Sequence, residues 1–243
     1  IRQHCTVALG GDGGDELFGG YGHYSRLQWM QKNLRLIPRP LLKCISWAAK
    51  NFLPDGFAGS NIRTWLMVLG QDLNRELPQV ATCFDSISRQ KLMKGSKGYG
   101  YVAEEIHRNM VLGHPSLLQR ATRMDFTNYL AEDILVKVDR SSMLNSLEIR
   151  APLLDYRLIE FAFGKVPSYL KATEHDKKIL LKRLTARILP PEFDRQRKQG
   201  FSIPLDEWLK SGPFRELFHE VLRDPRCGFD AEIIEDLLRR QDR

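Results

Sequence analysis

The sequence predicts an α/β fold whose 243 residues are mainly α-helical, with one short strand at Thr6 to Leu9. That segment is a β-type apolar run placed directly before a glycine-rich loop, and apolar residues recur at helical spacing through most of the chain after it. The hydrophobic content of 42% is sufficient for a large core. A chain of this length can form one large domain or two small ones, and we expect a single domain over residues 1–243.

The predicted elements follow from the spacing of apolar residues and the positions of proline. Thr6 to Leu9 has the composition of a central strand and nothing ahead of it for pairing, so we expect earlier sequence to supply the rest of a sheet. Arg150 should lie in an extended segment because Pro152 follows it closely. Residues 94–98 are expected to form a mobile loop. Helices are predicted from about Leu17 to near Pro38, and over residues 41–52, 63–69, 124–147, 154–163, 179–189, 205–209, 214–222 and 231–238.

The composition argues against several classes of protein. No apolar run approaches the roughly 18 residues of a membrane span, and the four scattered cysteines favour neither disulfides nor a zinc site. We expect a cytoplasmic protein. The net charge of +7 is concentrated in residues 171–200, where nine basic side chains stand against four acidic ones. Only Phe193 supplies an aromatic ring there, so a nucleic-acid groove is not predicted.

The loop from Gly10 to Glu16 has the sequence Gly-Gly-Asp-Gly-Gly-Asp-Glu. A glycine loop between a strand and a helix directs backbone N–H groups toward an anion, but three carboxylates would repel a bare phosphate. A divalent cation removes this conflict, and Mg²⁺ prefers such oxygen ligands. The letters fit neither a Walker loop nor an EF-hand, and the GxGxxG pattern fails at Glu16. In the alternative interpretation, Asp12 and Asp15 only cap the following helix.

Three ordered blocks of the chain resemble the glutamine-hydrolysing asparagine synthetase family. The first is VALGGDGGDELFGGY at residues 7–21. The second is YLAEDILVKVDR at residues 129–140, followed by SLEIRAPLLD at residues 146–155. The third is RKQGFSIP at residues 197–204, with Trp208. Because the blocks span most of the chain in order, the resemblance is more specific than any one motif.

The resemblance implies an adenine-nucleotide α-hydrolase-like fold, in which ATP activates aspartate as β-aspartyl-AMP with release of pyrophosphate. Ammonia from a glutaminase domain would then attack the adenylate and give asparagine. Formation of a homodimer stays open. By resemblance, the site residues are the ATP contacts Gly10, Gly11 and Gly13, the catalytic Asp12 and Lys198, the Mg²⁺ ligand Asp15, and the substrate contacts Asp139 and Arg150.

Two departures from the family pattern limit these expectations. Gly10 stands where the family usually has serine, so one hydroxyl contact to the nucleotide would be missing. The first phosphate loop of the family, of the SGGxDS type, and the N-terminal cysteine of the glutaminase domain do not occur in the 243 residues. We therefore expect this chain to be the C-terminal portion of the synthetase domain and to be inactive on its own.

Other interpretations stay open at the level of sequence. Related enzymes with the same blocks close lactam rings or amidate other carboxylates, and an inactive nucleotide-binding homologue would keep the fold without the chemistry. Arg150 could instead form a structural salt bridge with Asp139 or Asp155. Lys178 and Arg183 lie in the basic segment, where a solvated helix face is the favoured interpretation.

Overall fold

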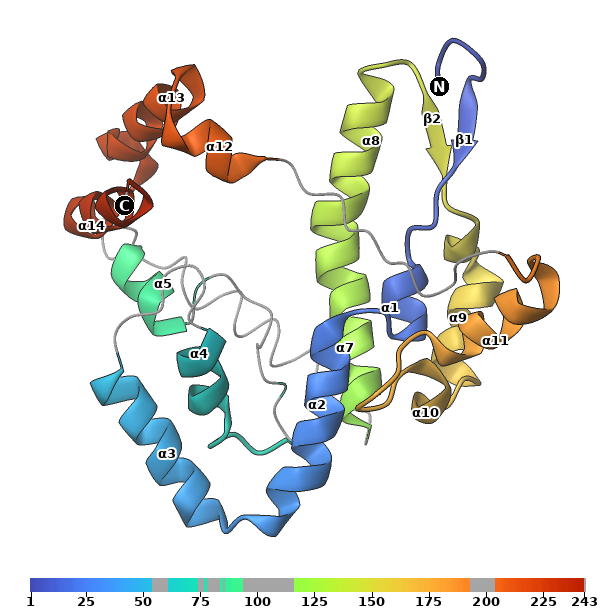
Figure 1. Ribbon diagram of the computed structural model, residues 1–243, viewed down its shortest axis with the longest axis horizontal. Coiled ribbons are helices and arrows are strands. Elements are labelled where there is room, and N and C mark those ends of the chain that lie inside the picture. The colour runs from blue at the N-terminus through green and yellow to red at the C-terminus, as the bar shows by residue number, and fades with distance from the viewer. Residues whose placement is uncertain are drawn as a thin grey trace. The chain divides into compact units, whose positions relative to one another are not determined.

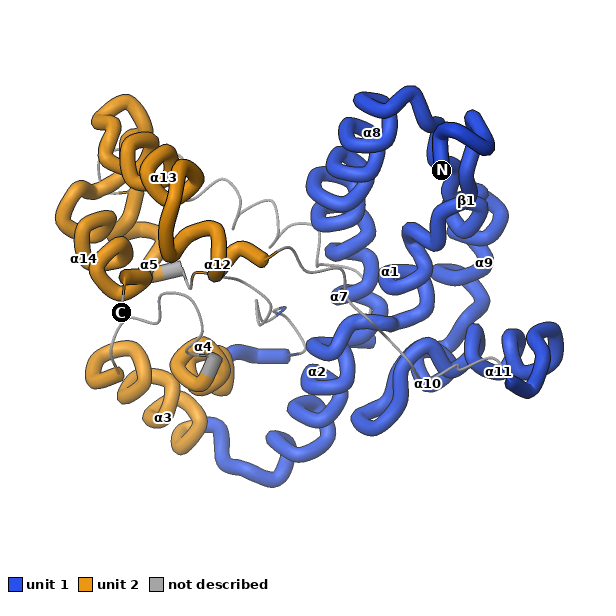
Figure 2. Tube along the Cα trace, turned by 45° about the horizontal axis from the view of Figure 1, so that its top comes forward, with its two compact units in different colours: residues 1–39, 71–78, 107–195 blue, residues 40–70, 79–106, 196–243 orange. Residues whose placement is uncertain are grey.

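The computed structural model describes residues 1–53, 61–73, 77, 84, 86–93, 116–192 and 204–242. The chain divides into two compact units, residues 1–39, 71–78 and 107–195 in the first and residues 40–70, 79–106 and 196–243 in the second (Figure 2). The two units are described separately below. The single domain expected from the sequence stays a prediction.

The first unit contains a short parallel sheet. Strand β1 (Val7–Leu9) pairs with β2 (Glu148–Arg150), with Val7 opposite Glu148 and Leu9 opposite Arg150 (Figure 1). The strand expected at Thr6 to Leu9 is thus confirmed, beginning one residue later. Its partner is the extended segment predicted before Pro152, which comes much later in the chain. Parallel pairing of this kind requires a long crossover, and helices of the first unit supply part of it.

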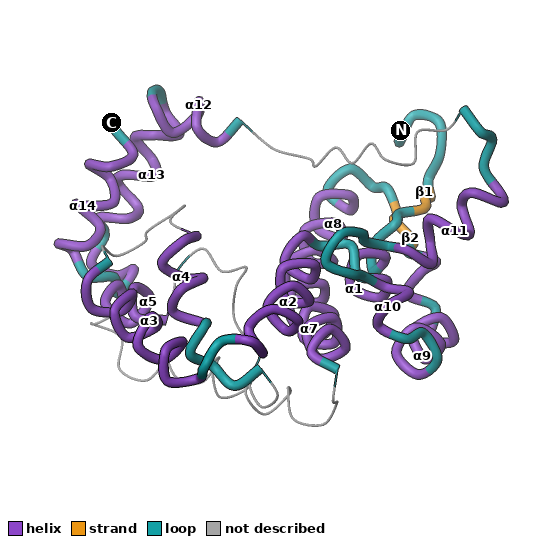
Figure 3. Tube along the Cα trace, turned by 60° about the horizontal axis from the view of Figure 1, so that its bottom comes forward, coloured by secondary structure: helices purple, strands orange, loops and turns teal. Residues whose placement is uncertain are grey.

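Helices make up most of the remaining described residues, in agreement with the predicted mainly helical chain (Figure 3). In the first unit they are α1 (Gly14–Phe18), α2 (Gly22–Asn33), η1 (Leu34–Leu36), α7 (Leu117–Asp125), η2 (Phe126–Ile134), α8 (Leu135–Met143), η3 (Pro152–Leu154), α9 (Tyr156–Gly164), α10 (Ser168–Lys171) and α11 (Ile179–Ile188).

The single helix predicted from Leu17 to near Pro38 is wrong, because the chain leaves the helix after Phe18. Gly19 has a φ of +73°, a left-handed conformation that favours glycine, and the N–H of Gly20 donates to Asp15 O at 2.8 Å. A Cβ on Gly19 would also lie 3.1 Å from the backbone carbon of Lys171. The helix after the glycine loop is therefore only five residues long, and α2 begins as a separate element.

The predicted helix over residues 124–147 is confirmed in outline but begins earlier and changes type. Helices α7, η2 and α8 follow one another directly, and η2 has π-helical hydrogen bonding. Such segments are rare and often occur at functional sites. Helix α8 packs against β2, so the last part of this run lies beside the sheet.

The core of the first unit holds the short helix α1 in place. Leu17 and Phe18 of α1 are buried against Ala162 of α9. Since α1 carries Asp15 and Glu16 on its other positions, burial of its two apolar side chains fixes where these carboxylates lie. The half-buried side chains that complete the cluster are Phe126, Ile159, Phe163, Leu180 and Leu181.

All regular elements in the described residues of the second unit are helices. Its core joins Leu92 of α5 to Ile234 and Leu238 of α14. The side chain of Asp230 accepts hydrogen bonds from the first N–H groups of α14, and its own N–H donates to Leu92 O at 2.8 Å. The helices are α3 (Arg39–Phe52), whose first residue belongs to the first unit, α4 (Asn61–Val68), α5 (Ser86–Leu92), α12 (Leu205–Lys210), α13 (Pro213–Arg223), η4 (Pro225–Cys227) and α14 (Ala231–Gln241).

Among the residues that the structure describes, none of the helices has the length and apolar character needed to cross a membrane. The loop expected at residues 94–98 lies outside the described residues.

Candidate functional site

The glycine loop continues directly from the sheet into α1. The N–H of Gly10 donates to Arg150 O at 2.7 Å, which extends the parallel pairing by one step. The N–H of Gly14 then donates to Gly11 O at 3.2 Å, closing a tight turn. Gly11 is exposed, and a Cβ added to it would meet nothing within 4 Å. The backbone at Gly11 is therefore accessible to a ligand.

Gly13 meets two requirements that only glycine satisfies at this position. Its φ is +84°, and a Cβ would lie 2.2 Å from Cδ2 of Leu154 in η3. The turn can therefore enter α1 only because residue 13 has no side chain. Neither Asp12 nor Asp15 caps α1, because Gly13 is the N-cap residue and no side chain accepts a hydrogen bond there. The capping interpretation of this loop is wrong.

Replacing Gly13 with alanine should lower the free energy of unfolding by roughly 2–4 kcal/mol, since a left-handed alanine and an overpacked contact with Leu154 each cost about 1–2 kcal/mol. Urea denaturation measures the change. Gly11→Ala is the matched control in the same loop, and we expect it to change stability by less than about 0.5 kcal/mol. Equal effects of the two substitutions would contradict the role assigned to Gly13.

Asp12 folds back over the start of the loop. A Cβ on Gly10 would lie 2.7 Å from Oδ2 of Asp12, so the half-buried carboxylate occupies the space that a side chain at position 10 would need. The glycine at position 10 is thus matched to this position of Asp12. A serine at position 10 would require the Asp12 carboxylate to move.

Asp15 faces a lysine that the sequence interpretation placed on a solvated helix surface. Nζ of Lys178, the residue just before α11, lies 2.9 Å from Oδ1 of Asp15. The two side chains are only 33% and 26% exposed. For Lys178 the solvated-face interpretation is wrong, whereas Arg183 of α11 is exposed. No signal local to residue 178 predicts this contact, because the turn before α11 creates it.

Next to Asp15, Glu16 points into the protein and is almost fully buried. Its carboxylate accepts a hydrogen bond from Tyr21 Oη, and burial raises the pKa of Glu16 and, more strongly, that of Tyr21. The Tyr21 ring stacks on His23 and meets Tyr129 of η2 edge-on. Sequence alone does not separate Glu16 from Asp15, and the two residues differ in burial on α1.

His23 joins α2 to the end of α7. Its Nε2 lies 2.8 Å from Oδ2 of Asp125, and both side chains are largely buried. The pair lies directly before the π-helix η2. Within the described parts of the chain, no group of three or more His, Cys, Asp or Glu side chains could hold a metal ion by itself.

The residues predicted to bind the substrate lie on neighbouring elements. Arg150 ends β2, and its Nε donates a hydrogen bond to Glu148 Oε1 at 2.6 Å. The alternative prediction that Arg150 forms a salt bridge with Asp139 or Asp155 is therefore wrong. Asp155 instead pairs with Arg157. Asp139 is exposed on α8, the helix that packs against β2. Lys198, the second predicted catalytic residue, lies outside the described residues.

Comparison with known proteins agrees with these features. The sequence profile of the family described as "Asparagine synthase" matches residues 1–243. The chain belongs to the asparagine synthase family. It is 31% identical over 237 residues to "Asparagine synthetase [glutamine-hydrolyzing] 1" of Bacillus subtilis (strain 168), covering 97% of this chain and 36% of that protein. It is 28% identical over 235 residues to "Putative asparagine synthetase [glutamine-hydrolyzing]" of Mycobacterium bovis, covering 96% and 35%. No solved structure matches the chain significantly.

This member of the asparagine synthase family spans about a third of the length of these relatives. The family has an adenine-nucleotide α-hydrolase-like fold and uses ATP, and the two parallel strands and the glycine loop after β1 agree with that fold. In open α/β sheets, ligands bind beyond the carboxyl ends of the strands. Gly10 to Asp15 follow the carboxyl end of β1, and Arg150 ends β2.

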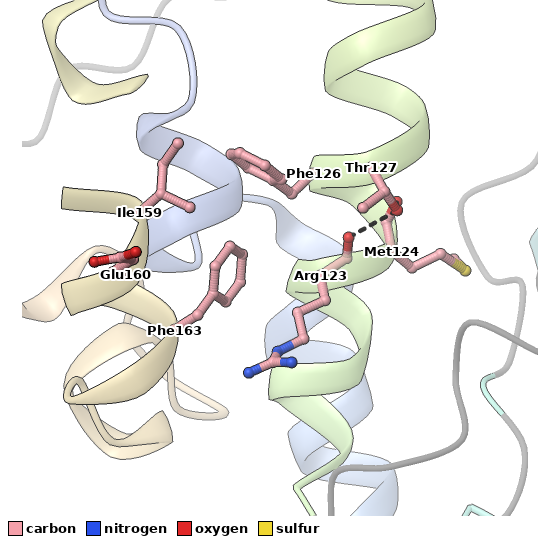
Figure 4. Close-up of a pocket in the computed structure, with 7 residues that line it drawn as sticks. All are labelled: Arg123, Met124, Phe126, Thr127, Ile159, Glu160 and Phe163. Carbon is pink, nitrogen blue, oxygen red and sulfur yellow. Dashed lines mark hydrogen bonds between the residues drawn. The ribbon is translucent and has the colours of Figure 1, made fainter. Parts of the chain in front are cut away.

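A separate groove of about 470 Å³ lies between the α7–η2 run and α9 (Figure 4). Phe126, Ile159 and Phe163 point toward one another across it, and Glu160 points away. The guanidinium carbon of Arg123 lies 5.3 Å from the centre of the Phe163 ring. None of the predicted site residues that the structure describes lines this groove.

Proposed function

We propose that this chain forms part of the ATP site of an enzyme that converts the side-chain carboxylate of aspartate into an amide. The carboxylate oxygen attacks the α-phosphorus of ATP, pyrophosphate leaves, and ammonia derived from glutamine displaces AMP from the acyl carbon. The observation that supports this most directly is the arrangement at the carboxyl end of β1. There, an open glycine backbone is followed by Asp15, with the ammonium of Lys178 at 2.9 Å.

The geometry around the loop fits a nucleotide polyphosphate. The accessible backbone at Gly11 lets a ligand approach closely, and Lys178 supplies a positive charge beside Asp15. Helix α1 is too short to contribute a full helix dipole, so the backbone N–H groups and the cations carry the attraction. Asp12, whose carboxylate lies next to Gly10, would help to form the adenylate.

The donor set at Asp15 fits Mg²⁺ held jointly with phosphate oxygens. Mg²⁺ sites at nucleotides commonly use one or two carboxylates, with phosphates and water completing the octahedron. Asp15 provides one carboxylate, and no cluster of three ligating side chains exists in the described residues. When bound there, Mg²⁺ would neutralise charge on the phosphates. Lys198 would add a cation at the leaving pyrophosphate.

Asp139 and Arg150 are the proposed contacts of the amino-acid substrate. Arg150 is exposed and at the end of β2, and its guanidinium has the geometry to hold a carboxylate by two hydrogen bonds. Its present contact with Glu148 is an exposed pair of the kind that contributes little stability. Exchange of Glu148 for a substrate carboxylate is therefore feasible energetically.

The proposal predicts that the intact protein exchanges labelled pyrophosphate into ATP only when aspartate is present. Exchange reports adenylation without the ammonia step, so it tests the first half-reaction alone. Lys198→Ala should reduce the exchange rate at least about a hundredfold if Lys198 acts at the pyrophosphate. Exchange that depends on another carboxylic acid would instead support a related amidating or lactam-forming enzyme. No exchange with any acid would point to an inactive nucleotide-binding homologue.

A further inference from the structure

The ion pair between Asp15 and Lys178 places two cations in competition for one carboxylate. Lys178 already neutralises Asp15 at 2.9 Å, and Asp15 is the residue proposed to bind Mg²⁺. We propose that Lys178 is the resident counter-ion of Asp15, which the divalent cation must displace on binding. This inference rests on the proposed function, which assigns Asp15 to the metal.

The backbone around Lys178 fixes the ammonium in this position. Lys178 has φ 53° and ψ 35°, one of two positive φ values among described non-glycine residues. A left-handed lysine is unfavourable by itself, so surrounding contacts must hold it. Two such contacts are the bridge between Ala172 and Lys177 and the hydrogen bond from Thr173 N to Asp176 O at 2.8 Å. The turn therefore presents Lys178 to α1 at a local conformational cost.

Gly20 provides the space that the ion pair needs on its other side. A Cβ on Gly20 would lie 1.7 Å from Asp15 Oδ1 and 2.3 Å from Lys178 Cε. Gly20 is buried, and its N–H bonds to Asp15 O, so the backbone cannot shift away easily. Gly20 thus lies against the Asp15–Lys178 contact, and the left-handed backbone of Lys178 directs the lysine into it. This is more structure than an incidental surface ion pair requires.

Charge explains why the lysine would leave when a metal arrives. Asp12 and Asp15 lie three positions apart in the loop, so without a cation the loop would concentrate negative charge. Lys178 supplies one positive charge while no nucleotide is bound. A divalent cation on the same carboxylate would repel the ammonium strongly at this separation. Lys178 would then be free to turn toward phosphate oxygens, which the metal brings in.

Binding of Mn²⁺ to the chain, measured by the electron paramagnetic resonance signal of free Mn²⁺ at low ionic strength, tests the competition. Lys178→Gln should tighten Mn²⁺ binding about three- to tenfold, since an ion pair of this exposure has to be broken in the original chain. Lys178→Arg keeps the charge and should leave the affinity within about twofold. Lys182→Gln is the matched control, because Lys182 lies on α11 and pairs with Asp176 instead. It should leave the affinity unchanged.

The outcomes separate this inference from the proposed function. Unchanged, weakened or unmeasurable Mn²⁺ binding in Lys178→Gln would overturn the competition between Lys178 and the metal. In the double variant Lys178→Gln with Asp15→Asn, the gained affinity should be lost. If Mn²⁺ binds the double variant as tightly as Lys178→Gln, Asp15 is not the ligand, and the metal assignment in the proposed function fails. Circular dichroism of each variant checks that the fold is retained.

Discussion

Replacing Lys171 with methionine is expected to flatten the pH dependence of stability between pH 7 and about 10. Lys171 is fully buried, its Nζ donates to Gln119 Oε1 at 3.0 Å, and the same nitrogen lies 4.7 Å from the centre of the Phe163 ring. Burial, with a smaller contribution from the positive charge of Arg123, lowers the pKa of Lys171 from 10.5 to about 7. Among the residues that the structure describes, no carboxylate is recorded at hydrogen-bond distance from this ammonium.

The direction of the effect follows from proton binding in the two states. The unfolded chain keeps the Lys171 proton up to about pH 10.5, whereas the folded chain releases it near pH 7. Between these values the unfolded chain binds more protons, so the free energy of unfolding of the original protein rises with pH. At about 1.4 kcal/mol for each pKa unit, the rise is on the order of 5 kcal/mol. Methionine, which has no titrating group, should remove this contribution.

Urea denaturation at several pH values measures the rise in both proteins. The difference between their slopes isolates Lys171 from cysteines and tyrosines that titrate in the same range. Lys165→Met is the matched control, because Lys165 is exposed just after α9. It should keep the original slope. If Lys171→Met keeps the slope as well, then Lys171 does not titrate near neutrality. Near pH 6 the methionine variant should be more stable than the original chain.

The helices of this fold could be predicted well where the spacing of apolar residues sets their bounds. They could be predicted less well where a single glycine ends a helix. The helices around residues 41–52, 179–189, 214–222 and 231–238 occur close to their expected bounds. The long helix predicted after the loop failed because Gly19 adopts a left-handed conformation, which an apolar pattern does not encode. Strand pairing between residues 7–9 and 148–150 could not be predicted, since it depends on the chain's return across many residues.

The candidate site also contains residues that the sequence could identify and residues that it could not. The residues of the glycine loop could be found from the sequence because four glycines and three acidic residues occur within seven positions. Lys178 could not be found. Its neighbours in sequence are mostly charged, and only the turn from Ala172 to Lys177 brings its side chain to Asp15. Glu16 differs from Asp15 only in the direction in which α1 presents it.

Substitution of Asp15 should mainly lower turnover, whereas substitution of the adjacent Glu16 should mainly change stability. In the intact protein, Asp15→Asn is expected to lower the turnover of the proposed ATP-dependent amide formation by roughly a hundredfold to a thousandfold, the typical loss for one preorganised charge contact in an active site. Asparagine keeps the shape but not the charge that would hold Mg²⁺. The change in stability should be small, because the lost pair with Lys178 is partly exposed.

Glu16→Gln should instead act mainly on stability. Glu16 is 1% exposed and accepts a hydrogen bond from Tyr21, which also packs on His23 and Tyr129. Glutamine can still accept from Tyr21 through its carbonyl oxygen, so turnover should fall less than about tenfold, while the free energy of unfolding changes by about 1 kcal/mol. Steady-state rates at saturating and limiting Mg²⁺, together with urea denaturation, separate the two effects. Equal losses of turnover in both variants would mean that the carboxylates act as one unit, and that the assignment of the metal to Asp15 alone is wrong.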